Sequence, residues 1–133
     1  MVTMGAIVEF LFPSARPLID YQVGNDGAGG AIVYWSATLG PQPTPAERAA
    51  AELPAAKHFA IAANRAECSR RIFERYPTGR QLSALAGLYD SANVATMTDW
   101  IAANISAENT AADEIEAATT VQAVEAVSVS WPA

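Results

Sequence analysis

Side chains that commonly carry nucleophilic chemistry are scarce in this sequence. It contains one histidine, His58, and one cysteine, Cys68, which could serve as a general base and a nucleophile. Ten positions separate them, so on one helix they would not face each other. Carboxylate pairs such as Asp113 and Glu116 are expected on a solvent-exposed surface. Nothing there would shift the pKa of either carboxylate toward the range needed for proton transfer. We therefore expect no catalytic residue and no enzymatic activity.

The glycine-rich run from Gly24 to Gly30 could in principle bind a phosphate or a cation. A P-loop needs a following Gly-Lys-Ser/Thr, which is missing, and a dinucleotide fingerprint needs a glycine that opens a helix. A calcium loop needs several alternating oxygens, and only Asn25 and Asp26 offer side-chain oxygens. One His and one Cys are too few for a zinc site. The run is predicted to be a hairpin tip, with no metal and no cofactor.

Composition limits how large a core the 133-residue chain can bury. Hydrophobic residues make up 51% of the chain, but 29 of them are alanines, which bury little area. We therefore expect the fold to depend on a partner or on copies of itself. The net charge of −6 argues against nucleic-acid binding, and no apolar stretch is long enough to cross a bilayer. No basic residue follows Arg80, so the chain has a basic middle and an acidic end.

The N-terminal part reads as strands. The apolar run AIVEFLF at residues 6–12 predicts a first strand, and residues 18–23 alternate with the period of a half-buried strand. After the glycine turn, residues 31–35 supply a return strand. The expected result is a β hairpin or three-stranded unit.

A proline-rich joint at residues 40–45 precedes the helical part. Thr44 can cap the next helix, with Glu47 completing a capping box, and Pro54 is expected to kink or break it near Leu53. Residues 55–76 form the strongest predicted helix. Its main face is expected to comprise Phe59, Ala62, Ala66, Ser69, Phe73 and Tyr76, with Ile61, Cys68 and Ile72 on a second flank.

The remaining signals predict two more helices and a final strand. Residues 77–79 end the long helix, a short helix follows over 80–90, and Ser91 or Asn93 can cap a third. Alternation at residues 127–131 predicts a short terminal strand. The fold class is therefore α+β, with a β-rich domain at residues 1–43 and an α-helical domain at 44–133.

Several of these motifs occur together in one known group of proteins. Asp20-Tyr21, Asp26-Gly27, Ile32, Trp35 and the stretch from Gly40 to Glu47 resemble phage tail-fibre assembly chaperones and the related short XkdW-like tail proteins. The stretch from Arg65 to Ile72 and the closing Val-Ser-Trp-Pro are similar to the same group. Ala28 and Ala31 depart from it, because related hairpins carry an acidic residue and an aromatic there.

The resemblance implies a chaperone that binds the distal part of a phage tail-fibre subunit and assists its folding and trimerisation. Its partner would be the fibre protein, in a 3:3 complex with a homotrimer of this chain, in the host bacterial cytoplasm during assembly. The alternative is a structural tail, baseplate or fibre-adaptor component retained on the virion. The fibre-contacting candidates, which could equally form the small domain's own core, are Phe10, Phe12, Tyr21, Tyr34 and Trp35; the oligomerisation candidates are Phe59, Ile72, Phe73, Trp100 and Ile101.

Overall fold

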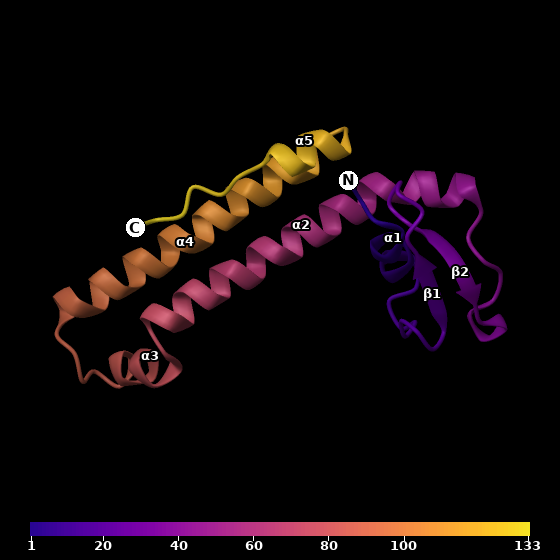
Figure 1. Ribbon diagram of the computed structural model, residues 1–133. Coiled ribbons are helices and arrows are strands. Elements are labelled where there is room, and N and C mark those ends of the chain that lie inside the picture. The colour runs from indigo at the N-terminus through magenta and orange to yellow at the C-terminus, as the bar shows by residue number, and fades with distance from the viewer. The chain divides into compact units, whose positions relative to one another are not determined.

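The computed structural model describes residues 1–133 and is mainly helical (Figure 1). Helix accounts for 62% of the residues and strand for 8%, which confirms the α+β class. No helix is long and apolar enough to cross a membrane. In chain order the elements are α1 (Met4–Leu11), β1 (Tyr21–Gly24), β2 (Ala31–Trp35), the short 3-10 helix η1 (Ala37–Leu39), α2 (Pro45–Arg75), α3 (Thr78–Leu85), α4 (Ser91–Ala117) and α5 (Val121–Ala126).

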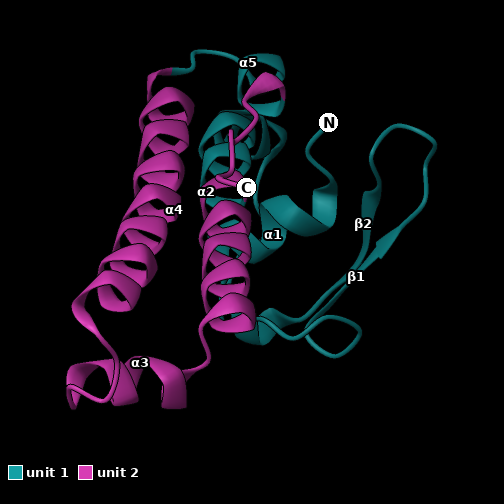
Figure 2. Cartoon of the chain, turned by 90° about the vertical axis from the view of Figure 1, so that its left-hand side faces the viewer, with its two compact units in different colours: residues 1–59, 118–125 teal, residues 60–117, 126–133 magenta.

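The chain forms two compact units, coloured separately in Figure 2. Unit 1 comprises Met1–Phe59 and Ala118–Glu125, and unit 2 comprises Ala60–Ala117 and Ala126–Ala133. Helix α2 contributes to both, since the division falls within it. Whether residues 1–43 and 44–133 act as separate domains stays a prediction.

Residues 6–12 form most of a helix, so the strand predicted there is wrong. The hydroxyl of Thr3 caps α1 by accepting a hydrogen bond from the Ala6 amide at 3.2 Å. Ile7 and Val8 face inward and are 3% and 0% exposed. A short, mostly apolar run, here with Glu9 as its one polar residue, fits a strand and a helix equally well. The sheet consequently has two strands rather than three.

The hairpin itself is confirmed. Strand β2 covers the predicted residues 31–35, and it pairs antiparallel with β1, Tyr21 lying opposite Trp35. Strand β1 starts at Tyr21 rather than at residue 18, and a register shift lies between Gln22 and Val23. Gly30 has a φ of +101°, and a Cβ there would lie 2.7 Å from a Val23 methyl, so only glycine fits.

The capping box at the start of α2 is also confirmed. The Glu47 amide donates to the Thr44 hydroxyl at 3.2 Å, and the Thr44 amide donates to the Glu47 carboxylate at 2.7 Å. The helix continues through Pro54 without a break. Proline removes one backbone donor, and the hydrogen-bonded turns on both sides keep the helix intact.

Helix α2 buries a different face from the one expected. Cys68 is 6% exposed and Ile61 and Ile72 are half-buried, so the predicted second flank packs inward. On the predicted main face Ala62, Ala66 and Ser69 are exposed and Phe73 is 53% exposed. The two ends of that face do pack inward, since Phe59 is half-buried and Tyr76 is 9% exposed. Both faces have helical spacing, and only the position of α4 decides between them.

Helices α2 and α4 run antiparallel side by side within unit 2 (Figures 1 and 2). The inward residues of α4 are Met97, Asn104, Glu108, Ala111 and Ile115. They are spaced by seven, four, three and four residues, as along a coiled-coil seam. Asp90 caps α4, rather than Ser91 or Asn93, by accepting from the Asn93 amide at 2.8 Å. Near the N-terminal end of α4, Tyr76, Ala84 and Met97 form a small core.

Two other predictions near the C-terminus need correction. Helix α3 occupies Thr78–Leu85 rather than residues 80–90, and Gly87, with a φ of +75°, follows it. Residues 121–126 form α5, and no strand forms over 127–131. Trp131 instead lies under the guanidinium of Arg71, which is 5.4 Å from the ring centre.

Candidate functional site

The aromatic residues of unit 1 cluster around Trp35. The Phe12 ring lies edge-on to Trp35 with 5.0 Å between ring centres, and Tyr21 lies 6.4 Å away on a tilted plane. The indole nitrogen of Trp35 donates to the Gly40 carbonyl at 2.9 Å, which ties the cluster to the proline-rich joint. These contacts give the small hairpin a core of its own.

The five fibre-contacting candidates are therefore not equally accessible. Tyr21 is 5% exposed, Phe12 and Trp35 are half-buried in the cluster, and Phe10 is half-buried against the His58 ring at 5.6 Å. Tyr34 alone is exposed, at 47%. The structure brings Phe12, Tyr21 and Trp35 together and leaves Tyr34 on the outer surface of β2.

A short turn before β1 presents two large apolar side chains that were not among the predicted site residues. Leu18 is 77% exposed and Ile19 is 59% exposed. Leu18 has a φ of +66°, a left-handed conformation that is unfavourable for a residue with a branched side chain. Its amide donates to the Tyr21 carbonyl at 2.8 Å, which holds it in this conformation.

An Arg16–Asp20 ion pair closes this turn. The Asp20 carboxylate accepts from the Arg16 amide at 2.8 Å and from the guanidinium at 3.0 and 3.1 Å. These bonds lower the pKa of Asp20, the side-chain bond contributing most. The spacing Arg16-Pro17-x-x-Asp20 is the signal that could have revealed the turn. The turn therefore holds Leu18 and Ile19 in place before any partner arrives.

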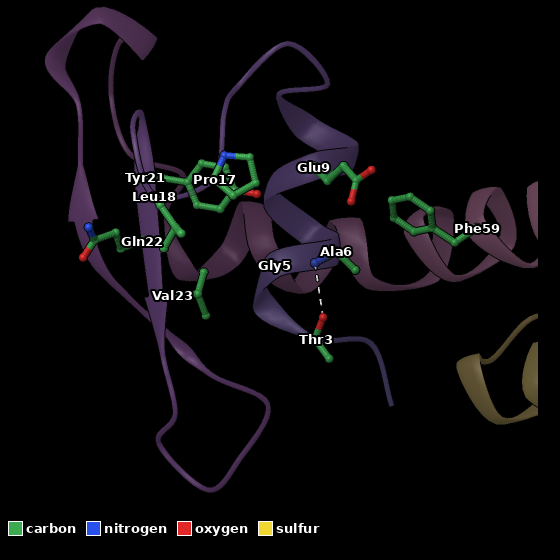
Figure 3. A pocket seen from close by; sticks show the side chains of 10 residues that line it. All are labelled: Thr3, Gly5, Ala6, Glu9, Pro17, Leu18, Tyr21, Gln22, Val23 and Phe59. Carbon is green, nitrogen blue, oxygen red and sulfur yellow. Dashed lines mark hydrogen bonds between the residues drawn. The ribbon is translucent and has the colours of Figure 1, made fainter.

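An open groove of about 440 Å³ lies beside this turn, between α1 and β1 (Figure 3). Leu18, Tyr21 and Val23 line its β1 side, and Ala6 and Glu9 project from α1. Burial raises the pKa of the Tyr21 phenol, and the nearby Glu9 carboxylate raises it further. The groove can accept an apolar side chain, with one carboxylate at its rim. Its full lining is Thr3, Gly5, Ala6, Glu9, Pro17, Leu18, Tyr21, Gln22, Val23 and Phe59.

The oxygens at the hairpin tip are used within the tip itself. Asp26 accepts from the Ala28 and Gly30 amides, both at 2.8 Å, and Asn25 accepts from the Gly27 amide at 2.9 Å. The backbone bonds from Ala28 and Gly30 lower the pKa of Asp26. No group of three or more His, Cys, Asp or Glu side chains converges in the chain.

The oligomerisation candidates occupy different environments. Phe59 lines the groove of unit 1, Ile72 is half-buried and Phe73 is exposed. Trp100 and Ile101 pack on the small core of unit 2, and the Trp100 indole donates to the main-chain oxygen of Ala133 at 2.8 Å. Phe73 is thus the member of this set with a large free apolar surface.

The two potentially reactive side chains also have structural neighbours. The His58 ring contacts Phe10 and Phe59, with 5.0 Å between the His58 and Phe59 centres. Cys68 is buried on α2, and burial raises the pKa of its thiol, as does the negative charge of Glu108.

The comparison with protein families concerns this same part of the chain. Residues 4–60 match the model of the XkdW protein family. This is a phage-associated family, and the match covers less than half of the 133 residues. No curated protein and no solved structure matches the chain.

The XkdW-like region, residues 4–60, nearly coincides with the first segment of unit 1, Met1–Phe59. It contains α1, the Arg16–Asp20 turn, the hairpin and the first half of α2. The stretch from Arg65 to Ile72 lies outside it. The phage-associated similarity therefore belongs to the unit that carries the groove and the exposed turn.

Proposed function

We propose that this chain is a phage tail-fibre assembly chaperone that binds the fibre subunit through unit 1. The observation that carries the proposal is the pair of exposed side chains, Leu18 and Ile19, held on a closed turn in the XkdW-like region. Large apolar side chains fixed in their bound conformation lose little entropy when a partner covers them. Such residues commonly dominate the energy of protein interfaces.

The hairpin supports binding to a strand-rich partner. Its sheet has only two strands, so β2 has one edge without a neighbouring strand, while the outer edge of β1 is bridged to Pro17 at Tyr21. Val33 and Tyr34 on β2 are 64% and 47% exposed. An extended segment can add to such an edge through main-chain hydrogen bonds while its side chains enter an adjacent groove. The groove between α1 and β1 has room for an apolar side chain of that segment.

A strand-exchanging fibre subunit needs this kind of cover. Fibre trimers exchange strands between chains, so an unassembled subunit exposes unpaired edges and apolar surface that favour aggregation. Transient cover by the hairpin lowers the population of wrong pairings without ATP. In this proposal three copies of the chain serve three fibre subunits in the host cytoplasm.

Co-expression with a tail-fibre protein of the same phage tests the proposal. We expect soluble, trimeric fibre that co-purifies with the chain at equal stoichiometry. Leu18→Asp should abolish co-purification, whereas Leu85→Asp on α3, where the leucine is 85% exposed, should not. Soluble trimeric fibre formed equally well without this chain would reject the proposal. Stoichiometric presence of the chain in purified virions would instead favour a permanent tail component.

A further inference from the structure

Helices α2 and α4 each carry an exposed stripe on the side turned away from their shared seam. On α2 the stripe is Ala62, Ala66, Ser69 and Phe73, and on α4 it is Thr98, Ala102, Ile105 and Asn109. Each runs at steps of four, three and four residues, the spacing at which one helix packs along another. Phe73 is 53% exposed and Ile105 is 45% exposed, so each stripe has one large apolar residue with about half of its surface open to solvent.

The level of each stripe along the helices follows from contacts across the seam. Arg65 Nε lies 3.6 Å from Glu108 Oε1, and Arg71 Nε donates to Asn104 Oδ1 at 3.1 Å. Because the helices are antiparallel, these two contacts place Ser69 level with residues 104–106. They place Phe73 level with residues 100–102. The two stripes therefore occupy the same length of the helix pair, one on each helix.

The charges on the two helices are complementary. From residue 60 to 75, α2 carries four arginines and two glutamates, while α4 carries five carboxylates and no lysine or arginine. Arg65 and Arg70 flank the α2 stripe, with side chains 71% and 58% exposed. Within the same copy Arg65 pairs with Glu108, and Arg70 pairs with Glu67 and Glu74. Asp99 and Asp113 flank the α4 stripe and are exposed. The net charge is therefore positive over residues 60–75 of α2 and negative over α4, which favours contact between different helices of two copies.

We propose that the α2 stripe of one copy packs against the α4 stripe of a second copy, in a heterologous contact that can close into a ring. The inference deepens the self-association that accompanies the proposed chaperone function. In a ring whose axis follows the helices, neighbouring copies are not shifted along that axis. Phe73 of one copy then lies at the level of Ala102 of the next, and Ile105 lies at the level of Ser69. Each large side chain meets a small one, as interdigitating helices require.

Reciprocal variants of the full chain test the contact in the absence of any fibre. Wild-type protein should be oligomeric by light scattering coupled to gel filtration. Phe73→Glu and Ile105→Glu should each yield monomers, because each variant destroys one stripe. An equimolar mixture should yield dimers of twice the 14.0 kDa chain mass, since one intact stripe of each kind remains. Leu85→Glu, at an exposed leucine outside both stripes, should leave the wild-type mass unchanged.

Several outcomes would overturn the contact. A monomeric wild-type chain, oligomeric single variants or a mixture that stays monomeric would each do so, and oligomeric single variants would point to like faces meeting. Circular dichroism checks that the variants are folded. If Phe73→Glu is not folded, Ala66→Glu replaces it, and if Ile105→Glu is not folded, Ala102→Glu replaces it. The variant pair should still bind fibre if unit 1 is the fibre-binding part. Loss of self-association and loss of fibre binding are therefore separate results.

Discussion

Arg71 and Asn104 join α2 to α4 through a hydrogen bond of 3.1 Å from the guanidinium Nε to the amide Oδ1. Asn104 is fully buried, and its amide nitrogen donates to the Trp100 carbonyl at 2.9 Å. Arg71 also donates to the Pro132 carbonyl and lies over the Trp131 ring. One buried amide therefore orients the arginine that holds the C-terminal segment.

Replacing Asn104 with Ala should destabilise unit 2. The change leaves the Arg71 guanidinium without a buried acceptor, a loss that costs about 1 to 3 kcal/mol. Urea denaturation followed by circular dichroism measures the free energy of unfolding. Asp99→Asn, at an exposed position on the same helix, is the control and should change it by less than about 0.5 kcal/mol. Equal stability of N104A and the wild type would show that the amide contributes nothing.

Stability should depend on the ionisation of Asp20 in acid. Hydrogen bonds from Arg16 hold the pKa of Asp20 below its ordinary value of 3.8, so folding favours the charged carboxylate. The resulting stabilisation is fully present above that value and is lost as the pH falls through the lower pKa of the folded state. Asp20→Asn should therefore be less stable than wild type near neutral pH, and the difference should shrink as the pH drops below 3.8. Unfolding curves across the acidic range measure this, and a constant difference would contradict it.

Thr44→Ala should weaken the start of α2. It removes the hydroxyl that accepts from the Glu47 amide, and loss of such a cap costs about 1 kcal/mol. Thermal unfolding should show a lower midpoint. Thr44→Ser keeps the hydroxyl and should remain within about 0.5 kcal/mol of wild type. Two variants that melt together would rule out a capping role for the hydroxyl.

Leu18→Gly should separate folding from partner binding. Glycine removes the cost of the left-handed conformation, about 1 kcal/mol, while its greater freedom in the unfolded chain offsets much of that gain. Stability should therefore change little in urea denaturation. Binding to co-expressed fibre should fall because the exposed side chain is gone. Large destabilisation with retained binding would mean that Leu18 serves the fold instead.

Much of the local structure could be predicted because its signals lie within a few residues of one another. Thr44 and Glu47 cap the helix that they begin, and the glycine run forces the reversal between β1 and β2. The aromatic candidates show the limit of such reasoning. Aromatic residue types alone indicated either a core or an interface. The pairing of β1 with β2 decides that Tyr21 lies beside Trp35 and that Tyr34 is exposed.

The sequence by itself determined where chain reversals, caps and the long helices occur, because backbone preferences act between neighbouring residues. The tertiary structure decided which side of each element became the inside. Residues 6–12 became a helix, and α2 turned Cys68 rather than Ala66 inward. The physical reason is that burial depends on elements distant in the chain, as when α4 supplies Asn104 to Arg71, and a repeating apolar pattern does not say which of two faces will find such a partner.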